Sequence, residues 1–105
     1  MRSWAFVAEA ADELADAVRW YEEQEEGVGA RFDNVVRDTL DALCQGRIAT
    51  GPVPGASARS PIRRVLVPKF PFALIVEETP ERVLVLAVAH AKRRPGYWRS
   101  RAARR

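Results

Sequence analysis

The sequence has a single cysteine, a single histidine and a single methionine among its 105 residues. Cys44 has no second cysteine with which to form a disulfide, and there is no Cys/His cluster that could hold zinc. The chain therefore suits a reducing compartment, and we expect a cytoplasmic protein with no metal and no cofactor. Cys44 also falls within a helical pattern of apolar residues, which favours a small buried side chain over a catalytic thiol.

Long hydrophobic runs are also missing. The longest unbroken apolar run, residues 83–89, has seven residues, whereas a membrane-spanning helix needs about 20. Acidic residues at positions 9, 12 and 13 argue against a signal peptide, so we expect a soluble protein. A chain of 105 residues with 48% hydrophobic content can bury one core and is short for two. We therefore predict a single domain over residues 1–105.

Charge is divided unevenly along the chain. Residues 1–46 have 4 basic and 11 acidic side chains, a net charge of −7, and residues 47–105 have 13 basic and 3 acidic, a net charge of +10; −7 and +10 give the +3 of the whole chain. A cationic half of this density suits an acidic partner or a phosphate backbone. Ordinary surface charge would give the same count, so both interpretations stay open.

Apolar periodicity predicts two helices in the acidic part. Apolar residues recur every three or four positions over residues 8–26 and again over residues 30–45. Gly27 is suited to end the first helix, and Glu25 and Glu26 lie close to the positive N-terminus of the second. The short connection makes the two helices antiparallel neighbours.

Strands are predicted for the remainder. Residues 4–7 form a short N-terminal strand, and a loop rich in glycine and proline follows the helices over residues 46–61. Three more strands follow, joined by turns short enough to make them antiparallel: 62–67, 70–77 and 82–90. The last is apolar on both faces and is expected to be central. The basic tail has no apolar period and is expected to be frayed from about residue 99.

The predicted fold class is α+β, with an N-terminal strand and a two-helix antiparallel hairpin packed on a small antiparallel sheet. Four segments, in this order, resemble the RelE/ParE toxin family, also called plasmid stabilisation proteins. They are the helix that ends Trp20-Tyr21-Glu22-Glu23-Gln24; Gly27-Val28-Gly29-Ala30-Arg31-Phe32; Ile62-Arg63-Arg64-Val65-Leu66-Val67 with Lys69-Phe70-Pro71-Phe72; and Val85 to Trp98, which closes His90-Ala91-Lys92-Arg93-Arg94-Pro95-Gly96-Tyr97-Trp98. Together they cover about residues 4–100.

The resemblance implies the toxin component of a type II toxin–antitoxin system, which inhibits growth when it is freed from its antitoxin. ParE-like members inhibit DNA gyrase, and we favour this action. RelE-like members instead cut messenger RNA on the ribosome, and a degenerate member would only bind its antitoxin. The expected partners are therefore an antitoxin that wraps the toxin in a hetero-oligomer, and either gyrase or the ribosome with its message.

By the same resemblance, the residues that match catalytic positions of RNA-cutting members are Arg64, His90, Arg93 and Tyr97. Ala73 stands where those members have an arginine, and Leu66 where some have a lysine. Losing such a preorganised cation costs about 3–4 kcal/mol of transition-state stabilisation, so enzyme activity is left open.

Each of these residues also has a structural interpretation. His90 could satisfy backbone groups at the end of its strand. Tyr97 and Trp98 could be packing anchors for the tail. Arg63 and Arg64 are neighbours on one strand and point to opposite faces, so at most one of them can share a site with Arg93.

Overall fold

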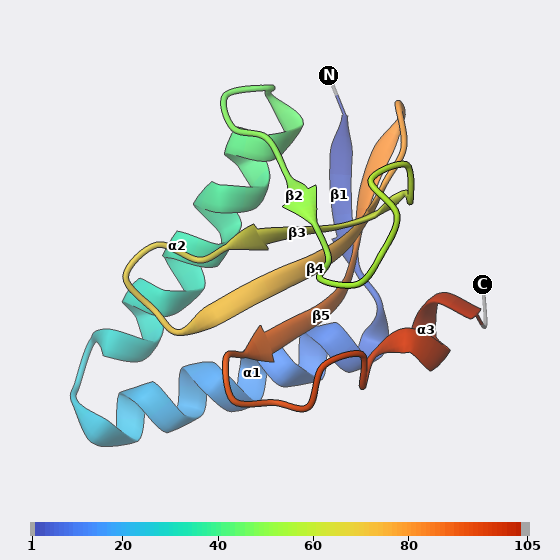
Figure 1. The fold of residues 1–105 in the computed structure, drawn as a ribbon. Helices are drawn as coiled ribbons and strands as arrows, with labels where there is room; N and C mark the ends of the chain where they lie inside the picture. The colour runs from blue at the N-terminus through green and yellow to red at the C-terminus, as the bar shows by residue number, and fades with distance from the viewer. Residues whose placement is uncertain (1, 104–105) are drawn as a thin grey trace.

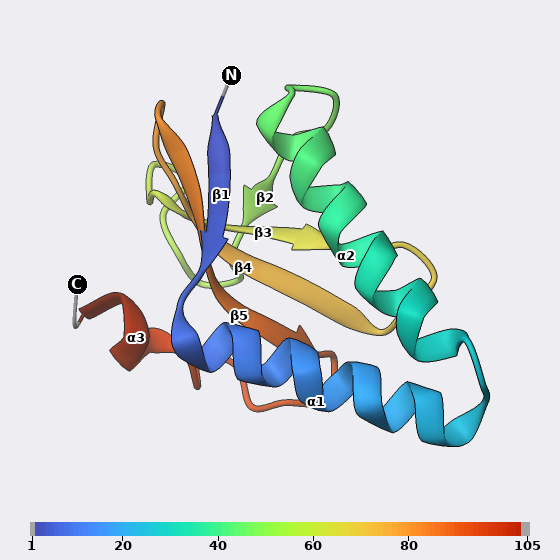
Figure 2. The same cartoon turned by 180° about the vertical axis from the view of Figure 1, so that it is seen from behind.

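The computed structural model describes residues 2–103 as two helices packed on a five-stranded sheet (Figures 1 and 2). The elements are β1 Ser3–Phe6, α1 Ala8–Gln24, α2 Val28–Cys44, β2 Gly51–Pro52, β3 Ile62–Leu66, β4 Phe72–Glu78, β5 Arg82–His90 and α3 Arg99–Ala103. The strand order is β1-β5-β4-β3-β2. The predicted α+β fold, with a helical hairpin on one face of the sheet, is confirmed.

The sheet is mixed rather than wholly antiparallel. β3, β4 and β5 form the predicted antiparallel ladders, and β2 adds a two-residue pair to β3 from within the predicted loop. β1, in contrast, runs parallel to β5, with Ser3 opposite Arg82 and Phe6 opposite Val85. β5 is therefore an inner strand, as its apolar faces predicted, while the direction of β1 is set by a pairing across some 80 residues.

The turn between the helices depends on Glu22 and two glycines. Gly27 has a φ of 89° and precedes α2 instead of ending α1. The Glu22 carboxylate accepts hydrogen bonds from the amides of Gly27 (2.8 Å) and Gly29 (3.0 Å), and these bonds lower its pKa. Glu22 therefore serves the positive end of α2, the role that the sequence suggested for Glu25 and Glu26.

A β-bulge changes which way the end of β5 faces. Ile75 pairs with Ala87 but the next residue of β4 pairs with Val85, so Leu86 is the extra residue of the bulge. Beyond it, Val88 faces the helices while Ala87 faces away from them. A regular strand alternates its faces and would place Val88 and His90 with Leu84 and Leu86. The bulge ends this alternation after Leu86, so His90 lies on the helix side.

Two apolar clusters cover the two faces of the sheet. The larger joins α1 and α2 to the sheet around Phe32, which is completely buried, and includes Cys44, as the sequence predicted; burial raises the pKa of this thiol. The smaller lies on the other face around Leu86 and Trp98, which is 5% exposed. Trp98 is thus a packing anchor.

The C-terminal segment, residues 91–103, is more ordered than expected. The sequence predicted fraying from about residue 99, but Arg99–Ala103 forms α3, and Arg101 bonds to Glu13 and to the carbonyl of Leu86. Residues 104 and 105, on which the rest of that prediction falls, lie outside the described residues. Within the described part, none of the helices is long and apolar enough to cross a membrane.

Candidate functional site

A small cavity lies on the face of the sheet that the helical hairpin leaves uncovered. Its volume is about 190 Å³. Ala73, Ile75 and Ala89 line it from neighbouring strands β4 and β5, which gives it an apolar floor. Arg64 of β3 lines it on one side and the segment 91–99 on the other. The sheet and the C-terminal segment therefore build this site together.

The rim of this cavity is cationic. The arginines that line it are Arg64, Arg93, Arg94 and Arg99, and no carboxylate side chain lines it. Among the described residues, none of these four arginines forms an ion pair with a carboxylate. Uncompensated cations around a hollow attract anionic groups. We call this site the cationic cavity.

Tyr97 is held at the cationic cavity by a bond outside it. Its hydroxyl donates to Oε2 of Glu13 at 2.8 Å. Burial, followed by this carboxylate, raises the pKa of Tyr97 to about 12. The guanidinium carbon of Arg93 lies 3.8 Å from the centre of the Tyr97 ring, a cation–π contact. Tyr97 therefore supports Arg93, and its proton is already committed to Glu13.

His90 is only partly a member of this site. It contributes to the cavity lining, but its ring meets Phe72 edge-on at a centroid distance of 5.1 Å, on the helix side of the sheet. Its Nδ1 atom accepts the amide hydrogen of Lys92 at 3.0 Å. Of the four residues that the sequence singled out, the structure brings Arg64, Arg93 and Tyr97 to one cavity and turns the His90 ring towards Phe72.

The position that RNA-cutting relatives fill with arginine is part of the apolar floor here. Ala73 lies opposite Leu66 on β3 and opposite Ala89 on β5. A cavity with this floor can bind an anion through its rim. It lacks a carboxylate base, and the cation expected next to a reacting phosphate is absent from position 73.

Sequence reasoning missed Glu13, whose contacts support the residues of this site. Its carboxylate bonds to Tyr97, to Arg101 and to the amide of Val88. A signal was present, because Ala10, Glu13 and Ala17 are three and four residues apart and share a helix face. An acidic residue on the buried face of an amphipathic helix needs a partner, but the sequence does not say which one.

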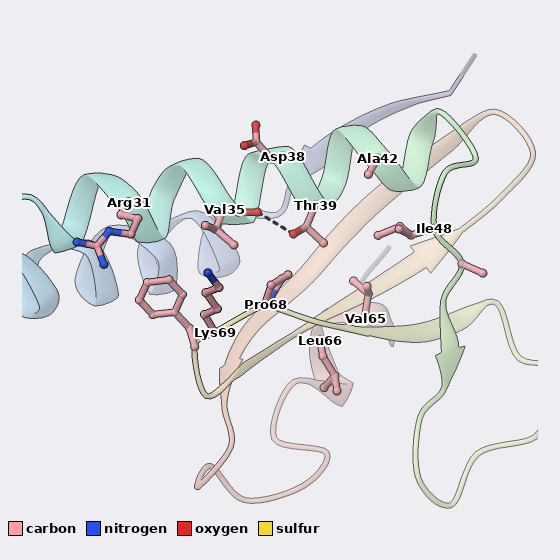
Figure 3. A pocket seen from close by; sticks show the side chains of 12 residues that line it. Arg31, Val35, Asp38, Thr39, Ala42, Ile48, Val65, Leu66, Pro68 and Lys69 are labelled. Carbon is pink, nitrogen blue, oxygen red and sulfur yellow. Dashed lines mark hydrogen bonds between the residues drawn. The ribbon is translucent and has the colours of Figure 1, made fainter.

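A second, larger hollow runs between α2 and β3 (Figure 3). This α2–β3 groove has a volume of about 690 Å³ and is mostly apolar, with Val35, Ile48 and Pro68 among its lining residues. Ile48 is 38% exposed. The Thr39 hydroxyl donates to the Val35 carbonyl of its own helix at 2.7 Å, so it adds no unpaired polar group to the groove.

Two features of this groove bear on what it can bind: the charge at one end and the backbone edge of β3 beside it. Arg31 and Lys69 line one end, and neither forms an ion pair with a described residue. Along β3, the short β2 pairs only with Arg63 and Arg64, so the outer edge of Leu66 has no strand beside it in the described part of the chain. Such an edge can pair with an added strand.

No group of three His, Cys, Asp or Glu side chains that could hold a metal ion occurs within residues 2–103.

The architecture and the two surfaces define a small α+β protein with an anion-attracting cavity on one face and an apolar groove on another. The sequence model of the ParE toxin of the type II toxin–antitoxin system parDE matches residues 5–95. The chain therefore belongs to the ParE toxin family, in the RelE/ParE superfamily of type II toxins.

A solved structure shares the fold. It is described as "Chromosomal ParDE TA system from P. aeruginosa" and superposes with a TM-score of 0.69 over 86% of this chain and 96% of that chain, at 14% sequence identity. The chain has no match among curated proteins.

Proposed function

We propose that this protein is a toxin that stops growth by binding DNA gyrase when it is freed from its antitoxin. Membership in the ParE toxin family supports the toxin role. The observation that carries the choice of target is the cationic cavity, whose rim offers four arginines while Ala73 occupies its floor. A toxin that works by binding needs the cations and does not need the acid and base of a nuclease.

The α2–β3 groove is the proposed docking surface for the antitoxin. Its apolar lining suits an amphipathic segment, and the unpaired edge of β3 suits strand addition. Arg31 and Lys69 at one end are complementary in charge to acidic residues on the partner. The expected occupant is therefore an antitoxin segment with apolar side chains along the groove and a carboxylate at this end. The complex would be a cytoplasmic hetero-oligomer.

A ribosome-dependent endoribonuclease is the second candidate, because Arg64, Arg93 and Tyr97 do meet at one cavity. Two reconstitutions separate the candidates. Purified toxin is added to gyrase with plasmid and scored for loss of supercoiling or trapped cleavage, and to translating ribosomes and scored for codon-aligned cuts in the message. We expect an effect in the first and none in the second; cuts in the message would make the enzyme the correct interpretation.

Substitutions at the rim test whether gyrase inhibition or message cleavage depends on the cationic cavity. Arg64→Glu and Arg93→Glu each reverse a cation at the rim, and we expect each to lower the potency of gyrase inhibition by about tenfold or more at low salt. The difference from the wild type should shrink at higher salt, because salt screens these charges. Arg19→Glu is the matched control, since Arg19 is an exposed arginine of α1 that does not line the cavity. If strong induction of the wild-type chain alone leaves growth unchanged, the protein is a degenerate toxin that only binds its antitoxin.

A further inference from the structure

The edge of β5 loses its strand neighbour halfway along. β1 pairs with β5 as far as Phe6 opposite Val85, and the amide of Val7 donates to the Val85 carbonyl at 3.0 Å. The chain then turns away into α1. The next groups on this edge, the Leu86 carbonyl and the Val88 amide, bond instead to side chains: to Arg101 at 3.0 Å and to Glu13 at 3.0 Å. Two side chains therefore replace the missing strand.

The Glu13 carboxylate is fully occupied by these contacts. Oε1 accepts from the Val88 amide and from Nη1 of Arg101, and Oε2 accepts from the Tyr97 hydroxyl and from Nη2 of Arg101, at 2.8–3.0 Å. The side chains of Glu13 and Arg101 are only 16% and 13% exposed. A mostly buried ion pair is tolerated where each oxygen is hydrogen-bonded. Because every oxygen of the carboxylate is used, these bonds form together only when Tyr97, Arg101 and Val88 hold their present positions.

The contacts of this cluster reach the wall of the cationic cavity through Tyr97. Tyr97 and Arg101 lie on either side of Trp98, which is buried against the uncovered face of the sheet. Holding the Tyr97 hydroxyl fixes the ring on which Arg93 lies at 3.8 Å. A chain of contacts therefore runs from Glu13 on α1, through Tyr97, to a guanidinium at the cavity rim.

We propose that Glu13, which does not itself line the cationic cavity, is the positioning residue that holds the C-terminal segment in place and so sets Arg93 at the rim. The contact geometry carries this inference; its functional part rests on the proposed role of the cavity in binding the target. Glu13 thus links the acidic α1 to the basic C-terminal segment, the two oppositely charged parts of the sequence.

The direct test uses nuclear magnetic resonance on the whole chain. Arg93 lies over the Tyr97 ring, so its side-chain protons carry a ring-current shift that reports this placement. In Glu13→Gln, which keeps the size of the side chain but removes its charge, we expect that shift to shrink and the Val88 amide to exchange at least about tenfold faster. Tyr97→Phe, which removes only the hydroxyl, should speed the exchange of residues 93–99 while leaving the Arg101 bonds in place.

Asp12→Asn is the matched control, because it makes the same change of charge at an exposed neighbour on α1. It should change neither the Arg93 chemical shifts nor the exchange rate of the Val88 amide. Unchanged Arg93 shifts and Val88 exchange in Glu13→Gln would overturn the proposal, whether or not the wild-type protein is toxic.

A comparison of gyrase inhibition with antitoxin binding separates a role in positioning Arg93 from a general loss of structure. Glu13→Gln should weaken gyrase inhibition by about tenfold, comparable to Arg93→Glu. Affinity for the antitoxin, which docks on the α2–β3 groove, should stay within about threefold. If Glu13→Gln weakened gyrase inhibition and antitoxin affinity equally, its role would be merely structural, and the proposal that it positions Arg93 would be overturned. If the wild-type chain does not inhibit gyrase, the proposed function fails, while the resonance and exchange readings still decide the role of Glu13.

Discussion

The imidazole of His90 meets the ring of Phe72 edge-on at 5.1 Å, on the face of the sheet opposite to Arg64. The β-bulge at Leu86 produces this arrangement, because one extra residue exchanges the faces of every later position in β5. The resemblance to RNA-cutting toxins placed His90 with Arg64 in one catalytic group. The structure gives the His90 ring a packing contact and a hydrogen bond from Lys92 instead.

We therefore expect His90→Ala to lower stability more than it lowers toxicity. The variant loses an aromatic contact of about 0.5–1.5 kcal/mol and a hydrogen bond of similar size, so its free energy of unfolding should fall by about 1–3 kcal/mol in urea denaturation. At a temperature where the variant is folded, growth arrest should persist. Loss of growth arrest in a folded His90→Ala protein would return His90 to the functional site.

The α2–β3 groove predicts how the toxin can escape neutralisation. Ile48→Asp puts a charge on a groove side chain that is already 38% exposed, so the fold should tolerate it. Its antitoxin should bind at least about tenfold more weakly, because a carboxylate loses hydration in an apolar contact. Calorimetric titration measures this affinity. Trp20→Asp is the control, since Trp20 is 55% exposed and lies outside the groove; comparable losses from both substitutions would count against this docking surface.

Gly29 is required by the close approach of the two helices. A β-carbon at this position would lie 2.4 Å from the carbonyl oxygen of Val18, a backbone atom of α1. Gly29→Ala should therefore push the helices apart and lower the free energy of unfolding by about 1–3 kcal/mol, as measured in urea. Gly51→Ala has open space around the added methyl group and should be nearly neutral, which makes it the comparison that isolates the clash.

Tyr97 predicts a change of stability at alkaline pH. Its pKa is raised to about 12 because the buried phenol is more stable uncharged and donates to Glu13. The contribution to stability is complete below the pKa of about 10 of an unfolded tyrosine and is lost as pH rises from there through the folded value near 12. Ultraviolet titration should show Tyr97 ionising well above an unperturbed tyrosine, and Tyr97→Phe should remove that part of the alkaline loss. Ionisation of Tyr97 near pH 10 in the folded protein would contradict the bond to Glu13.

Local patterns in the sequence were sufficient for most of the fold. The apolar spacing that buries Phe32 and Leu14 predicted both helices and their antiparallel packing, because a helix repeats every 3.6 residues wherever it lies. Short turns gave the antiparallel strands in the same way. The choice of Gly27 as a helix end, rather than as the start of α2, was wrong because a left-handed glycine serves either role and the deciding partner, Glu22, lies five residues away.

The sequence by itself determined the two helices, the apolar inner strand and the separation of negative from positive charge, since each depends on neighbours within a few residues. Only the tertiary structure decided the parallel pairing of β1, the bulge at Leu86 and the role of Glu13. The Glu13 carboxylate bonds to groups 75 to 88 residues further along the chain. No local pattern specifies such contacts, because they exist only after the sheet and the C-terminal segment have come together.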